Sequence, residues 1–139
     1  MAEKYKRPSL LNVLLVDDEK GYLHVLSNRL ARRSIKATTA FSGTQAIQIL
    51  RKNDFHVVVL DLKMEDMDGI EVLKVIKRMV PNLPVIILTG HGSQTAAREG
   101  IAYGAFDYLT KPCELLTLID KIHEAHRYQL KVSTKPFSE

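Results

Sequence analysis

The chain lacks most of the features that mark membrane, secreted or fibrous proteins. Its single cysteine, Cys113, excludes an intramolecular disulfide and is typical of a reducing cytoplasm, where we expect the protein to act. No apolar run approaches the roughly 20 residues of a membrane span, and the apolar segment after the basic start is too short for a cleavable signal peptide. Internal repeats and low-complexity segments are also missing. The remaining features, 139 residues of which 45% are apolar and 26% charged, are typical of one globular domain.

The positive charge lies mainly near the two ends of the chain. The formal net charge is +4, of which residues 1–9 and 131–139 together carry +3. The middle of the chain is therefore close to neutral, which indicates soluble tails rather than a face that binds nucleic-acid phosphates. We predict an N-terminal tail over residues 1–9, a folded domain over 10–130 and a C-terminal tail over 131–139, with no direct binding of nucleic acid by this segment and no membrane partner.

Short apolar segments alternate with longer segments of helical periodicity. The short segments predict strands, and the longer ones carry apolar residues at helical spacing. The segment 55–60 has no polar alternation, so we expect a central strand that is covered on both faces. The predicted strands span 10–16, 35–41, 55–60, 85–88 and 105–109, and the predicted helices span 19–33, 44–52, 70–79, 94–103 and 114–130. Five strands alternating with five helices predict an α/β fold, a parallel sheet between two helical layers with right-handed crossovers.

Charged side chains follow three of the predicted strands, at the point where each strand ends. Asp17 and Asp18 come directly after the first strand, Asp61 after the third and Lys111 after the fifth. Because the carboxyl ends of parallel strands share one edge of a sheet, we expect these side chains to meet in one crevice. Clustered carboxylates repel one another unless a cation joins them, so the pattern favours a hard, oxygen-ligated metal. Ordinary loop acids and acids at a helix start are the alternatives.

Two further features belong to the same edge. Thr89 ends the fourth strand and offers a hydroxyl group there, although a capping or turn threonine is the competing interpretation. Lys111 could balance the carboxylates and bind an anionic group attached to one of them. Pro112 follows it and permits a cis peptide bond.

These positions lie in fragments that together resemble the receiver domain of bacterial response regulators. The resemblance covers residues 10–128, and the fragments 89–93 and 108–112 are similar to receivers of the nitrogen-regulation type. The matching fragments are Val16-Asp17-Asp18-Glu19, Val58-Val59-Leu60-Asp61-Leu62-Lys63-Met64, Asp68-Gly69, Leu88-Thr89-Gly90 and Gly104-Ala105-Phe106-Asp107-Tyr108-Leu109-Thr110-Lys111-Pro112. Each fragment is weak alone, but their order and spacing together are specific.

The resemblance implies a flavodoxin-like sheet in the order 2-1-3-4-5 and a phosphorylation switch of a two-component system. Asp61 would accept a phosphoryl group from a sensor histidine kinase or phosphotransfer protein, and Lys111 and Thr89 would contact that group. The resemblance also implies Mg²⁺ as cofactor, switching through Thr89 and Tyr108, and a readout face on the fourth helix, fifth strand and fifth helix, which could also form a homodimer. It places the Mg²⁺ on Asp17, Asp18, Asp61 and the backbone carbonyl of Lys63.

Three positions near the expected phosphoryl group are less regular. Glu65 stands where the family usually has a proline, so we expect a looser loop after Asp61 and slightly altered metal affinity or switching. Lys63 and His91 flank the expected group. They are either solvated loop side chains or groups that tune how readily water reaches the acyl phosphate.

Two other functions compete with the switch. A Mg²⁺-dependent phosphohydrolase that uses an aspartyl nucleophile needs a second acid two residues further on, where this chain has Lys63. A long-lived phosphoaspartate suits a switch, so we predict that the protein is not an enzyme beyond slow self-dephosphorylation. A DNA-binding regulator needs more chain than follows the last predicted helix. We therefore expect a stand-alone receiver or a fragment of a longer regulator.

Overall fold

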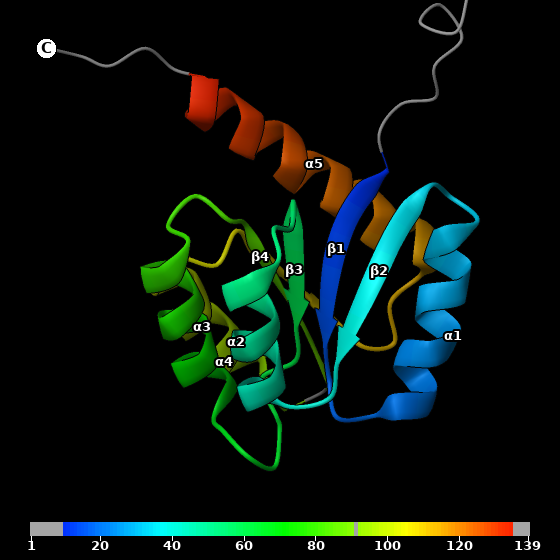
Figure 1. Cartoon of the computed structure of the whole chain (residues 1–139). Helices are drawn as coiled ribbons and strands as arrows, with labels where there is room; N and C mark the ends of the chain where they lie inside the picture. The colour runs from blue at the N-terminus through cyan, green and yellow to red at the C-terminus, as the bar shows by residue number, and fades with distance from the viewer. Residues whose placement is uncertain (1–9, 91, 135–139) are drawn as a thin grey trace, which may run out of the picture.

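The computed structural model describes residues 10–90 and 92–134, and in it five parallel strands form one sheet (Figure 1). The strands lie in the order β2-β1-β3-β4-β5, as the resemblance implied. Their bounds are β1 (Leu11–Val16), β2 (Ile35–Ala40), β3 (Val57–Leu60), β4 (Val85–Thr89) and β5 (Asp107–Thr110). All four residues of β3 are buried, which confirms the prediction of a central strand covered on both faces.

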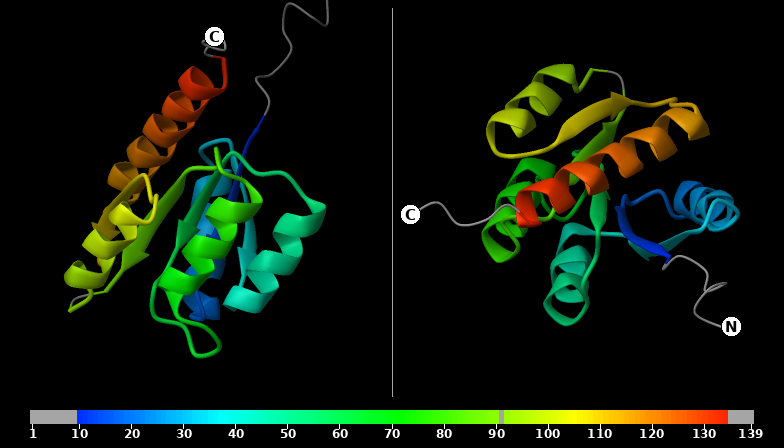
Figure 2. Two further views of the ribbon diagram at one scale, coloured as in Figure 1. Left: turned by 90° about the vertical axis from the view of Figure 1, so that its left-hand side faces the viewer. Right: turned by 90° about the horizontal axis from the view of Figure 1, so that it is seen from above.

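Five helices in the described part of the chain cover the two faces of the sheet, and Figure 2 shows their arrangement from two further directions. They are α1 (Lys20–Ala31), α2 (Gly43–Lys52), α3 (Gly69–Met79), α4 (Gln94–Ala102) and α5 (Leu115–Thr134). The buried apolar residues of α1 and α5 form one core cluster with the strands, and those of α2, α3 and α4 form another. Successive strand residues point to opposite faces, so Leu14 belongs to one cluster and Leu15 to the other. The predicted three-layer sandwich is confirmed.

The glycines around α4 weaken the helical pattern in the sequence, yet the helix forms. Gly100 is buried where α4 crosses β4, and a Cβ atom there would lie 2.3 Å from Cδ1 of Ile87. The missing side chain therefore lets the helix approach the sheet closely. Gly104 has φ of +108° and follows the end of the helix.

The last helix is longer than its sequence pattern predicts. It runs to Thr134, so residues 131–134 belong to α5 and not to the predicted C-terminal tail. The last turns of the helix extend past the strands (Figure 1). Leu130 and Val132 are exposed there, so they do not continue the apolar stripe that faces the core. His126 meets the ring of His56 just before β3, with centroids 4.8 Å apart, and Tyr128 meets Phe106 just before β5 at 5.5 Å. The predicted tail segments 1–9 and 135–139 lie outside the described residues.

The other strand and helix ends differ from prediction by a few residues. The largest shift among strands is in β5, which covers Asp107–Thr110 instead of 105–109. Within the described part of the chain, no helix is both long enough and apolar enough to cross a bilayer.

Candidate functional site

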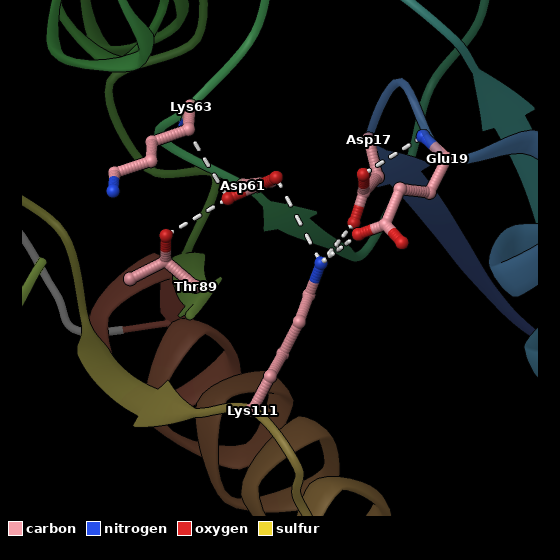
Figure 3. Close-up of polar contacts among 6 residues, drawn as sticks. All are labelled: Asp17, Glu19, Asp61, Lys63, Thr89 and Lys111. Atoms are coloured by element: carbon pink, nitrogen blue, oxygen red, sulfur yellow. Dashed lines mark hydrogen bonds and ion pairs between the residues drawn. The ribbon is translucent and has the colours of Figure 1, made fainter. Parts of the chain in front are cut away.

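The carboxyl ends of four strands meet at one edge of the sheet and bring the predicted residues together (Figure 3). Backbone pairing continues beyond the strands into this site. The N–H of Asp61 donates to the carbonyl of Val16 at 2.9 Å, and the N–H of Lys111 donates to the carbonyl of Thr89 at 2.8 Å. The side chains therefore start from backbone that the sheet itself holds in register.

Three carboxylates form a compact acidic cluster at this edge. Asp17, Asp18 and Asp61 each offer an oxygen atom within 4.8 Å of the other two. Asp17 is 3% exposed and Asp61 6%, so water screens their mutual repulsion poorly. Three carboxylate oxygens are a donor set that suits a hard cation such as Mg²⁺ and not a thiophilic metal. The cluster is therefore consistent with Mg²⁺ binding.

Asp61 lies at the centre of the site. The hydroxyl of Thr89, itself 2% exposed, donates to Oδ1 of Asp61 at 2.8 Å. The backbone N–H of Lys63 donates to the same oxygen at 3.3 Å. Burial raises the pKa of Asp61, and the charge of Asp17 raises it further, while the bond from Thr89 and the charge of Lys111 act in the opposite direction. The site thus holds a carboxylate in a setting that disfavours its negative charge.

Lys111 provides the positive charge of the site. Its ammonium lies 2.6 Å from Oδ2 of Asp17, 3.2 Å from Oε1 of Glu19 and 3.8 Å from Oδ2 of Asp61. Burial alone would lower the pKa of this lysine, but the hydrogen bond and charge of Asp17, together with the charge of Asp61, raise it overall. Lys111 is therefore charged at physiological pH. The peptide bond between Lys111 and Pro112 is cis.

Tyr108 lies two positions before Thr110, which is opposite Thr89 in the β4–β5 register. Its ring is partly buried and packs against the core cluster on the face covered by α2, α3 and α4. Tyr108 thus lies on β5, next to β4, which carries Thr89.

The loop after Asp61 is held at several points by residues other than Glu65, so the expectation that Glu65 loosens it stays a prediction. Asp66 accepts hydrogen bonds from the N–H of Gly43 and the N–H of Thr44, each at 3.0 Å, and from the hydroxyl of Thr44 at 2.9 Å. These bonds fasten the loop to the first residues of α2 and lower the pKa of Asp66. A bridge between Lys63 and Asp68 closes the loop on itself.

Sequence reasoning missed two neighbours of Lys111 and one anchor of the loop. Glu19 reads as an acid at a helix start, but its carboxylate pairs with Lys111. Tyr22 reads as an ordinary position of α1, but its ring lies beneath the Lys111 ammonium. Asp66 bonds residues more than 20 positions away. His91 lies outside the described residues, and Lys63 has an exposed side chain.

A parallel sheet in this order, whose carboxyl edge carries three carboxylates, a threonine and a lysine, defines a phosphoacceptor signalling domain. The chain matches the response regulator receiver domain family over residues 13–123 and belongs to that family. It is accordingly a phosphoacceptor switch of the two-component type.

Relatives and solved structures agree with this assignment. The transcriptional regulatory protein GlrR of Escherichia coli K12 is 38% identical over 114 residues, which are 82% of this chain and 26% of that protein. A receiver domain protein from Clostridium thermocellum has a TM-score of 0.85 and 34% identity, covering 88% of this chain and 99% of that one. The receiver domain of NtrX from Brucella abortus has a TM-score of 0.79 and 30% identity, covering 83% and 98%. The chain spans about a quarter of the length of the curated relatives it matches.

Proposed function

We propose that Asp61 is the phosphoacceptor of this receiver and that its phosphodonor is a sensor histidine kinase or a phosphotransfer protein. The observation that carries the proposal is the setting of Asp61. This buried carboxylate has the Thr89 hydroxyl at 2.8 Å, the Lys111 ammonium at 3.8 Å and two further carboxylates beside it.

The transfer needs little covalent chemistry from the protein. A carboxylate oxygen of Asp61 forms a bond to phosphorus while the bond from phosphorus to the donor atom breaks, and that atom keeps the electron pair. The transition state is loose, so positioning and charge neutralisation dominate. Lys111 supplies a fixed positive charge beside the accepting carboxylate. Thr89 supplies a hydroxyl that can turn from Asp61 to a phosphoryl oxygen.

Asp17, Asp18, Asp61 and the backbone carbonyl of Lys63 would hold a Mg²⁺ ion. The oxygen-only donor set of the three carboxylates supports this choice. When bound, Mg²⁺ neutralises charge on the phosphoryl oxygens and separates them from the carboxylates. Lys111 pairs with Asp17 and Asp61, so its charge already reduces part of the repulsion between the carboxylates that a bound cation would reduce further.

Thr89 and Tyr108 would transmit the phosphorylated state. If Thr89 moves toward a phosphoryl oxygen, it vacates space into which Tyr108 can turn from the neighbouring strand. The readout face would comprise α4, β5 and α5, and the same face could pair two copies of the chain. In support, Ile101 near the end of α4 is 40% exposed, and an exposed apolar side chain suits a protein contact.

The wider role follows from the relatives. GlrR is named a transcriptional regulatory protein, so we propose that this receiver controls the output of a cytoplasmic regulator of that kind without binding nucleic acid itself. Rapid turnover of phosphate esters is not part of the proposal. Lys63 stands two residues after Asp61, where a phosphohydrolase would need a carboxylate acid and base.

Acetyl phosphate with Mg²⁺ tests the assignment of Asp61. We expect intact-mass spectrometry to show one added phosphoryl group on the wild-type protein and none on Asp61→Asn or on wild type without Mg²⁺. Asp107→Asn is the matched control, since Asp107 lies on β5 and pairs with Lys121 at 2.8 Å. Phosphorylation of Asp61→Asn to the wild-type level would refute the proposal.

A further inference from the structure

The ammonium of Lys111 has a neutral neighbour in addition to its three carboxylates. Tyr22, in the first turn of α1, presents its ring to Lys111 with the nitrogen 4.7 Å from the ring centroid. The ring is partly buried and packs against the core cluster that α1 and α5 share. This distance and orientation are those of a cation–π contact, which favours the charged form of the lysine and restricts where it lies.

The carboxylates around Lys111 are the groups that a divalent cation would also engage. Asp17 holds the ammonium at 2.6 Å, and Asp61 lies at 3.8 Å. Both belong to the acidic cluster. A cation bound in that cluster would attract the same carboxylate oxygens and weaken the ion pairs that Asp17 and Asp61 form with Lys111. Tyr22 does not compete for a divalent cation, because burial raises the pKa of its phenol and a neutral phenol is a poor ligand for a hard cation.

We propose that Tyr22 is a positioning residue for phosphoryl transfer: its ring face keeps the Lys111 ammonium beside Asp61 when the carboxylates are engaged by a cation. The inference rests on the proposed function of Asp61 and Lys111. Glu19 also pairs with the ammonium, at 3.2 Å, but it is an exposed carboxylate and its attraction is screened by salt. The contact between the Tyr22 ring and the ammonium is partly buried. It involves no carboxylate, so neither a bound cation nor added salt competes for it directly.

Three substitutions at Tyr22 separate the ring contact from simple packing. Tyr22→Phe keeps the ring face, Tyr22→Leu keeps apolar bulk without a ring, and Tyr22→Met is used if Tyr22→Leu does not fold. Phe41→Leu is the matched control. Phe41 packs against the same core and lies under the ammonium of Lys20 at 5.4 Å, so its loss removes a cation–π contact without touching Lys111.

The first measurement needs no metal and no reaction. NMR of the metal-free protein follows the Cε protons of Lys111, which the aromatic ring current shifts upfield. We expect the shift to persist in Tyr22→Phe and Phe41→Leu and to disappear in Tyr22→Leu. An unchanged Lys111 signal in Tyr22→Leu would overturn the contact itself.

The second measurement is the rate of phosphorylation by acetyl phosphate across a range of phosphodonor and Mg²⁺ concentrations. We expect the maximal rate of Tyr22→Leu to fall about three- to tenfold, the range for loss of a partly buried cation–π contact in a transition state. Tyr22→Phe and Phe41→Leu should stay within about twofold of wild type, and the Mg²⁺ affinity of all variants should be unchanged, because no ligand is altered.

The outcomes distinguish this inference from the proposed function. If the wild-type protein accepts no phosphoryl group, both fail. If wild type reacts through Asp61 but Tyr22→Leu reacts equally fast, or Tyr22→Phe loses as much as Tyr22→Leu, the positioning role alone is overturned.

Discussion

At the scale of single residues, the site contains more negative than positive side chains. Three carboxylates lie within reach of one another, and Lys111 is the lysine that pairs with two of them. The strongest contact of Lys111 is with Asp17 and not with Asp61. Asp61 therefore keeps an incompletely compensated charge, which adds to the main effect, its burial, in raising the pKa of this carboxyl.

Removing the charge of Asp61 should stabilise the metal-free protein. Because the pKa of Asp61 is raised, chiefly by burial, the folded protein binds this proton more readily than the unfolded chain does, and stability falls as pH rises above the ordinary value of 3.8. Asp61→Asn keeps an acceptor for Thr89. We expect it to raise the free energy of unfolding by about 1 kcal/mol at neutral pH, the usual size of a point-mutation effect.

Urea unfolding of both proteins over a range of pH measures this effect. The gain should shrink as pH falls and vanish below the ordinary aspartate pKa, where both states are protonated. Asp54→Asn, at an exposed loop position, should change stability by less than about 0.5 kcal/mol. A destabilised Asp61→Asn at neutral pH would contradict the argument.

At the scale of elements, close approach and capping decide how the helices are placed. We predict opposite effects on stability for alanine substitutions at two helical glycines. A Cβ atom at Gly100 would lie 2.3 Å from Ile87, whereas one at Gly21 in α1 would meet nothing within 4 Å. We expect Gly100→Ala to lower the free energy of unfolding by about 1–3 kcal/mol through overpacking, and Gly21→Ala to raise it by up to about 1 kcal/mol through helix propensity. Chemical denaturation of the two variants side by side checks both signs.

The contact between Asp66 and α2 predicts a second effect at this scale. Asp66→Ala removes the acceptor of two backbone N–H groups at the start of α2. We expect the free energy of unfolding to fall by about 1–2 kcal/mol, as is typical for loss of a helix N-cap. Backbone amides in the loop after Asp61 should also exchange hydrogen faster. Asp66→Asn, which retains one acceptor oxygen, should lose less. Since the pKa of Asp66 is lowered, this stabilisation is present above the ordinary value of 3.8 and is lost as pH falls below it.

Part of this architecture could be predicted from the sequence. Strands and helices were predictable because their periodicity is local, and the convergence of Asp17, Asp61 and Lys111 was predictable because parallel strands end at one edge. The contacts of Tyr22 and Asp66 were not, because each joins a helix to a distant loop and leaves no mark on periodicity. The end of α5 was missed for a related reason, since its last turns extend beyond the sheet that imposes the amphipathic pattern.

At the scale of the whole molecule, cation binding and folding should be coupled. Mg²⁺ that binds only the folded acidic cluster should add about 2.7 kcal/mol to the free energy of unfolding at a concentration one hundred times its dissociation constant. Thermal unfolding in increasing MgCl₂ measures this, with NaCl at matched ionic strength as the control for screening. Asp17→Asn should remove most of the increase. Equal stabilisation by NaCl would show that no specific site is involved.

Helix α5 extends from the functional site to the opposite edge of the sheet. It begins at Leu115, four residues after Lys111, and continues to Thr134, passing His56 and Phe106 at the opposite edge of the sheet. Twenty helical residues form a rod about 30 Å long. A tilt of about 5° at its base therefore moves its far end by roughly 2.6 Å over that length. A rigid helix of this length would convert a small rotation beside the acidic cluster into a much larger displacement at the opposite edge of the sheet.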